Sequence, residues 1–108
     1  MMGFLQPCIL VQLKKQDCHG YELLKGLQDF VDDAREHDPS IIYRLMRDME
    51  DNDYVTSYEG EVSNGPPRKM YSITEEGKSI LQRWVVDLQR TRSEIDRLLM
   101  HFEKTEIL

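Results

Sequence analysis

The sequence predicts a mainly helical α+β fold, in which three short helices precede a two-stranded β-hairpin and one long helix. Two changes of pattern carry this prediction. Apolar residues recur at helical spacing up to about residue 51, and two short segments rich in β-branched and aromatic residues follow. After residue 74 no proline interrupts a last helical stretch. The 108 residues, 40% hydrophobic and 31% charged, suit one folded domain and exclude a disordered or fibrous class.

Apolar spacing and capping residues predict the first two helices. Residues 4–14 carry an apolar stripe at helical spacing, and Pro7 falls early enough for a first helical turn. Asp17 stands just before Cys18-His19-Gly20-Tyr21, where its carboxylate can accept the free backbone N–H groups of a new helix. The second helix is therefore predicted from Tyr21 to about Asp32.

The third helix has the clearest start signal, because Asp38 can cap it and the fixed φ angle of Pro39 suits its first position. It is predicted over residues 39–51. One face carries an apolar stripe at three- and four-residue spacing, formed by Ile42, Leu45, Met46 and Met49. The opposite face, predicted to meet solvent, presents Ser40, Tyr43, Arg44 and Arg47.

The hairpin is predicted from strands at residues 54–59 and 69–73, joined by a long tip with the turn chemistry of Ser63-Asn64-Gly65-Pro66-Pro67. Thr74, followed by Glu75 and Glu76, then restarts a helix, because a threonine caps well and carboxylates favour the positive end of a helix dipole.

The long helix carries a heptad seam that predicts a homodimer. Leu81, Leu88, Ile95 and Phe102 recur every seven residues, and nothing else in the chain could cover them fully. The predicted dimer contacts are Leu81, Trp84, Leu88, Ile95, Leu98 and Phe102. We therefore divide the chain into a domain of three helices and a hairpin over residues 1–74 and a dimerisation helix over residues 75–108, together one structural unit.

Three helices followed by a hairpin describe a winged helix-turn-helix, in which the third helix enters the DNA major groove and the hairpin tip reaches the backbone. The predicted DNA-binding residues are Ser40, Tyr43, Arg44, Arg47, Arg68 and Lys69. Arginine can bind guanine bidentately, and hydroxyl groups suit phosphate oxygens. The alternative is a solvated helix face with its arginines paired to nearby acids. Residues 40–70 hold four basic and six acidic side chains, so the acids must face away from DNA.

The sequence also resembles the PadR-like transcriptional regulators over nearly its whole length. The matching segments are His19-Gly20-Tyr21-Glu22-Leu23, Ile42-Tyr43-Arg44 through Met49-Glu50, Gly65-Pro66-Pro67-Arg68-Lys69-Met70-Tyr71 and Ile73-Thr74-Glu75-Glu76-Gly77. The opening Gln6-Pro7-Cys8-Ile9-Leu10, with His19-Gly20-Tyr21, is similar to the branch of polyhydroxybutyrate-responsive repressors.

This resemblance implies a homodimeric repressor of a palindromic double-stranded DNA operator, dimerised by its last helix, whose dimer interface in some members admits flat aromatic ligands. Trp84, the only tryptophan, is accordingly a candidate ligand-binding residue for a small hydrophobic or phenolic effector. Its alternative role is packing in the core or the dimer. A constitutive repressor without ligand is the corresponding alternative for the protein.

The sequence contains no pattern typical of an enzyme, a metal site or a cofactor site. Cys18 and His19 lack further ligands at metal spacing, and adjacent residues on one helix do not build a nucleophile and base, so burial is expected for Cys18 and for Cys8. No apolar run predicts a membrane span, and a cytoplasmic protein is expected. The net charge of −6 leaves one other function open, a winged-helix module that binds protein and not DNA through an acidic surface.

Overall fold

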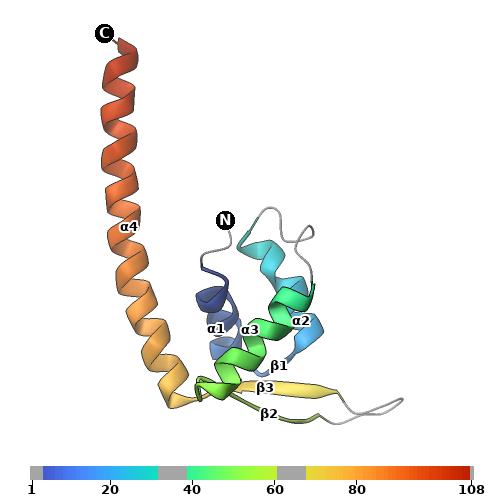
Figure 1. Cartoon of the computed structure of the whole chain (residues 1–108). Helices are drawn as coiled ribbons and strands as arrows, with labels where there is room; N and C mark the ends of the chain where they lie inside the picture. Colours follow the sequence, from blue (N-terminus) through green and yellow to red (C-terminus); the bar gives the residue numbers. More distant parts are fainter. Residues whose placement is uncertain (1–3, 32–38, 61–67, 108) are drawn as a thin grey trace.

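The computed structural model describes residues 4–31, 39–60 and 68–107, which form a compact helical domain and one long projecting helix (Figure 1). The elements in chain order are α1 (Leu5–Lys15), β1 (Cys18–His19), α2 (Gly20–Gly26), the 3-10 turn η1 (Leu27–Asp29), α3 (Pro39–Asp51), β2 (Val55–Glu59), β3 (Lys69–Ile73) and α4 (Glu75–Ile107). The predicted fold class is confirmed.

The second helix differs from its prediction at both ends. Its N-cap is His19 and not Asp17, because the His19 ring accepts the Glu22 N–H at 3.3 Å while the Glu22 carboxylate accepts the His19 N–H at 3.1 Å. Asp17 instead accepts a hydrogen bond of 2.6 Å from the Tyr58 hydroxyl on β2. At the other end, α2 stops at Gly26 and tightens into η1, so regular helix does not reach residue 32.

Helix α3 spans residues 39–51 as predicted and forms one wall of the core. Ile42, Met46 and Met49 are fully buried, while Leu45 is half-buried and packs against them. Asp38, the predicted cap, lies outside the described residues. The core is completed by apolar residues of α1 and α2, chiefly Ile9, Leu10, Leu13 and Leu23.

The predicted hairpin is present, and the structure adds a third, short strand. The sheet order is β1-β3-β2 and both pairings are antiparallel, with Tyr71 of β3 lying between Cys18 and Ser57. A two-residue strand carries no alternation of its own, so only its pairing with β3 reveals it. The predicted tip, Ser63 to Pro67, lies outside the described residues.

Helix α4 starts as predicted, with the Thr74 hydroxyl accepting the Gly77 N–H at 2.9 Å. A side chain at Gly77 would place its Cβ 2.1 Å from the Tyr54 carbonyl oxygen, so glycine permits this close approach. The first part of α4 packs against α1, and the rest extends beyond the domain, giving the molecule a length of 64 Å (Figure 1). Within the described ranges, no helix is long and apolar enough to cross a membrane.

Candidate nucleic-acid interface

The outward face of α3 presents two arginines without acidic partners. Arg44 and Arg47 are exposed, and neither forms an ion pair with any residue that the structure describes. The alternative, in which acids of the same helix pair with these arginines, is therefore not observed within α3. Ser40 and Tyr43 are also exposed, on the same side of α3 as predicted.

The base of the wing is connected to α3 through Glu50. Its carboxylate accepts a hydrogen bond of 2.7 Å from Ser57 on β2 and lies 3.4 Å from the ammonium group of Lys69 on β3. The Ser57 hydrogen bond, followed by the charge of Lys69, lowers the pKa of Glu50 despite partial desolvation. The Glu50 carboxylate of α3 thus contacts both strands of the wing, β2 through Ser57 and β3 through Lys69.

Arg68 lies at the other side of the wing, with its guanidinium nitrogen 3.1 Å from Nε2 of His19. Because Nδ1 of His19 accepts the Glu22 N–H, a neutral ring carries its proton on Nε2, which is 3.2 Å from the Glu22 carboxylate. Nε2 then has no lone pair for the guanidinium, which is itself only a donor. No acid among the described residues pairs with Arg68, so its N–H groups remain available to a ligand.

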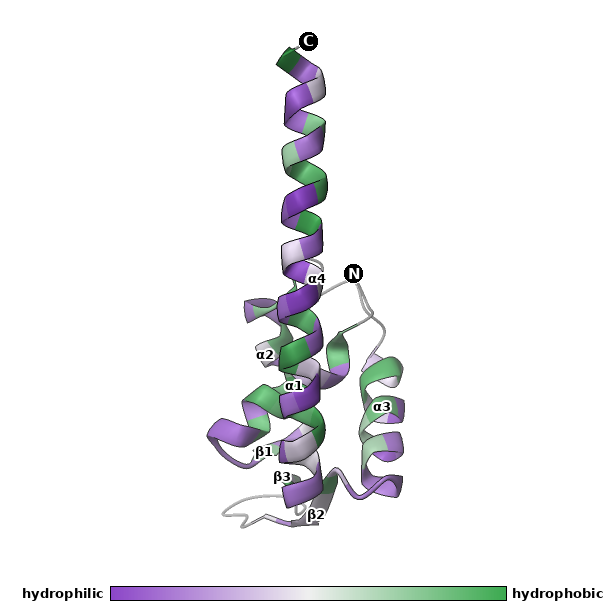
Figure 2. Cartoon of the chain, turned by 90° about the vertical axis from the view of Figure 1, so that its left-hand side faces the viewer, coloured by the Kyte–Doolittle hydropathy of each residue, from purple (hydrophilic) through white to green (hydrophobic). Residues whose placement is uncertain are grey.

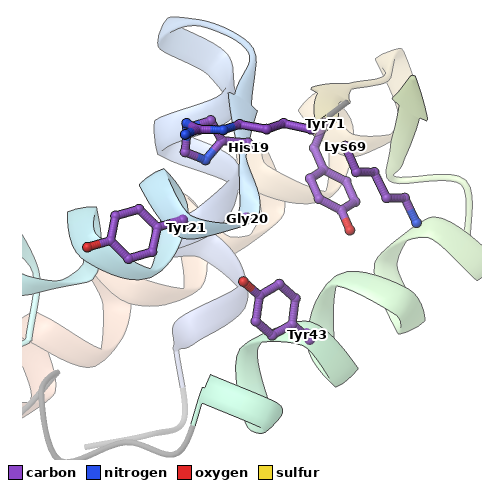
Figure 3. Close-up of a pocket in the computed structure, with 7 residues that line it drawn as sticks. His19, Gly20, Tyr21, Tyr43, Lys69 and Tyr71 are labelled. Carbon is purple, nitrogen blue, oxygen red and sulfur yellow. The ribbon is translucent and has the colours of Figure 1, made fainter. Parts of the chain in front are cut away.

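These elements enclose a pocket of about 540 Å³ between the start of α2, the outer face of α3 and strand β3 (Figure 3). Among the described residues its lining is aromatic and cationic, without a carboxylate: His19, Gly20, Tyr21, Tyr43, Arg68, Lys69 and Tyr71. Three of these, Tyr43, Arg68 and Lys69, are predicted DNA-binding residues that the fold brings together. Arg44, Arg47 and Ser40 lie outside the pocket on the exposed surface of α3.

Sequence reasoning did not assign His19, Gly20, Tyr21 or Tyr71 to the site. His19 to Tyr21 stood out only as a family-like segment, and Tyr71 only as a strand residue. The Tyr43 ring lies directly against Gly20, where an added Cβ would come within 2.8 Å of its Cε1 atom. A glycine at the start of a helix was thus a signal in the sequence that could have pointed to this site. The structure explains that glycine, because the Tyr43 ring of α3 packs against it.

The predicted dimer residues fall into two groups. Leu81 is buried in the chain's own core, and Trp84 is half-buried, donating a 2.7 Å hydrogen bond from its indole N–H to Gln6 on α1. Leu88, Ile95, Leu98 and Phe102 are 37–68% exposed. Figure 2 shows apolar residues along the part of α4 that extends beyond the domain.

A second, apolar groove of about 210 Å³ lies where α4 meets α1 and the residue after η1. Its lining consists of Phe4, Pro7, Cys8, Val11, Phe30, Leu81, Val85 and Leu88. It continues directly into the exposed part of α4 through Leu88, which belongs to both surfaces.

Both cysteines are buried, as expected. Burial raises the pKa of the Cys8 thiol, and burial together with the charges of Glu22 and Asp17 raises that of Cys18. Both thiols are therefore protonated and poorly nucleophilic near neutral pH. In the described part of the chain, no three histidine, cysteine or acidic side chains come together as a metal site would require.

Comparison with known proteins assigns the chain to a family. The sequence profile of the transcriptional regulator PadR-like family matches residues 9–83, so the protein belongs to that family. The family consists of transcriptional regulators, and the protein is accordingly not an enzyme.

Two sequence relatives differ in how much of their own length the match covers. The chain is 31% identical to a probable transcriptional regulator of Mycobacterium tuberculosis over 77% of its own length but only 44% of the relative. It is 27% identical to an uncharacterized protein of Lysinibacillus sphaericus, with 94% and 93% of the two chains covered.

Solved structures agree with the fold over most of the chain. A PadR-like regulator of Bacillus cereus superposes with a TM-score of 0.75 at 28% identity, covering 90% of this chain and 92% of the other. Bacillus subtilis PadR, solved in complex with operator DNA, has a TM-score of 0.65 at 24% identity, covering 76% and 46%. The latter identity supports the shared fold alone.

Proposed function

We propose that this PadR-like regulator binds double-stranded DNA as a homodimer, with α3 in the major groove and the wing against the backbone. The observation that carries the proposal is the pair of exposed arginines on α3, Arg44 and Arg47, which have no acidic partner in the described residues. The winged-helix architecture supports the proposal, because the recognition helix of this fold enters the major groove, and a protein of the same fold has been solved in complex with its operator DNA.

Dimerisation is supported by the apolar surface of α4. Leu88, Ile95, Leu98 and Phe102 are left exposed by the described part of the chain, and such an apolar stripe in water is unfavourable. A second copy, related by a two-fold axis, would bury the stripe and the neighbouring α1–α4 groove together. Two recognition helices then face a palindromic operator.

We further propose a repressor whose operator affinity is lowered by a flat hydrophobic or phenolic effector near Trp84. The support is the apolar α1–α4 groove, whose lining includes Val85, the residue next to Trp84; the indole itself does not line the groove and is hydrogen-bonded to Gln6. An effector acts only if it binds the DNA-free arrangement of the dimer more tightly than the DNA-bound one. The two ligands then weaken each other by the same factor.

The decisive experiment is a titration of the protein into a labelled duplex from the region upstream of its own gene, followed by fluorescence anisotropy. We expect specific binding that weakens steeply as salt rises, and no such preference for a shuffled duplex. Equal, weak binding to both duplexes would overturn the operator proposal and favour the protein-binding alternative.

The effector proposal is tested by adding a phenolic compound to the protein. We expect the compound to quench the fluorescence of Trp84 and to weaken operator binding.

A further inference from the structure

Tyr71 is a buried tyrosine whose hydroxyl has no hydrogen-bond partner among the described residues. The side chain is 6% exposed, and its ring lies 5.4 Å from the Lys69 ammonium. Figure 3 shows the hydroxyl pointing into the pocket between β3 and α3. A tyrosine hydroxyl that faces such a pocket donates its hydrogen bond to solvent until a ligand with an acceptor oxygen takes that place.

The pocket offers hydrogen-bond donors and positive charge from three elements. The Tyr43 ring is held against Gly20, with its hydroxyl oxygen 3.5 Å from where a Cβ would stand. Arg68 presents N–H groups that His19 does not accept in its capping tautomer, whereas Lys69 is already paired with Glu50 at 3.4 Å. No described residue of the lining carries a carboxylate, so Arg68 and the tyrosine hydroxyls suit an anion with several acceptor oxygens, such as a phosphate group.

We propose that this pocket is a phosphate site that takes one phosphodiester of the DNA backbone, with Tyr71 and Tyr43 as hydroxyl donors and Arg68 as the cation. The inference rests on the proposed DNA binding, because the pocket lies between α3 and β3, the two elements that we propose to contact DNA. Its volume of about 540 Å³ leaves room for the attached sugar, which the tyrosine rings would contact. The contact positions the recognition helix and carries no base preference.

The first test compares Tyr71→Phe with wild type on the upstream duplex and on a shuffled duplex of equal length. Loss of a hydrogen bond to a charged group should weaken both complexes by about tenfold. Thermal unfolding of Tyr71→Phe should occur near the wild-type temperature, since no described residue loses a hydrogen-bond partner of this hydroxyl. Tyr54→Phe, which removes a hydroxyl outside the pocket lining, is the matched control and should bind like wild type.

The second test locates the phosphate. Duplexes carrying a single neutral methylphosphonate are scanned with wild type and with Tyr71→Phe. One backbone position in each half-site should weaken wild type, and at that position Tyr71→Phe should cause little additional loss, because both changes remove the same contact.

The outcomes separate this inference from the proposed function. If wild type binds neither duplex, the proposed function fails, and with it the phosphodiester assignment. If wild type binds DNA but Tyr71→Phe binds equally well, the phosphate site alone is overturned. If inorganic phosphate or a mononucleotide competes with the same strength in wild type and Tyr71→Phe, and no methylphosphonate couples to Tyr71, the phosphodiester assignment is also overturned.

Discussion

Helices α3 and α4 are both amphipathic, yet they use their apolar faces differently. In α3, Ile42, Met46 and Met49 are completely buried in the core, and polar residues occupy the outward face. In α4, only the first part packs against other described residues, and residues such as Ile95 and Phe102 remain about half-exposed. An apolar stripe on a helix therefore predicts that the stripe is buried, but it does not indicate whether the same chain or a second molecule covers it.

The largest expected effect is on the uncovered stripe. Leu88→Asp combined with Ile95→Asp places two charges where we expect the partner helix, so the protein should become monomeric or aggregate and lose operator binding. Multi-angle light scattering at micromolar concentration measures this. Gln82→Asp with Gln89→Asp adds the same charge at exposed polar positions of α4 and should leave the dimer intact. A folded wild-type monomer at that concentration would contradict the prediction.

On α3, the exposed face should determine sequence preference. Replacing Arg44 or Arg47 by alanine should weaken operator binding by about 1–3 kcal/mol if the lost contact is bidentate to guanine. Binding to random DNA should change less. Arg83→Ala, an exposed arginine on α4, serves as the control. If both α3 variants bind the operator as tightly as wild type, α3 is not the recognition helix.

The wing should contribute to DNA affinity but not to the preference for one DNA sequence over another. Arg68→Ala should weaken operator and random duplexes alike and reduce the slope of log affinity against log salt by about one unit for a single phosphate contact. Titrations at several salt concentrations measure the slope, with Lys104→Ala near the end of α4 as the control. An unchanged slope for Arg68→Ala would place its guanidinium away from the backbone.

The smallest expected effect concerns the link between α3 and the wing. The pKa of Glu50 is lowered from 4.5 in the folded protein, so an unfolded chain binds a proton there more readily. The resulting stabilisation is present above pH 4.5 and is lost as the pH falls through the lowered folded value. Glu50→Gln should therefore show a flatter loss of stability with acid in urea unfolding, and an equally steep loss would count against this link.

The bounds of α3 and the start of α4 could be predicted because both depend on local signals. Helical spacing of apolar residues and the capping role of Thr74 act over a few neighbouring positions. The second helix was predicted less well, since the choice of His19 over Asp17 as its cap depends on a tyrosine of β2 that engages Asp17 from far along the chain.

What the sequence alone determined is the winged-helix order of elements, the polar and apolar faces of α3, and a last helix with more apolar surface than one chain can cover. Only the tertiary structure decided which residues meet. In the folded chain, Leu81 is buried in the core and Trp84 is hydrogen-bonded to Gln6 of α1. His19 and Arg68, 49 positions apart in the sequence, line one pocket together with Tyr43 and Tyr71. The physical reason is that periodicity and capping are local, whereas a pocket is made by side chains whose neighbours are set by packing between elements.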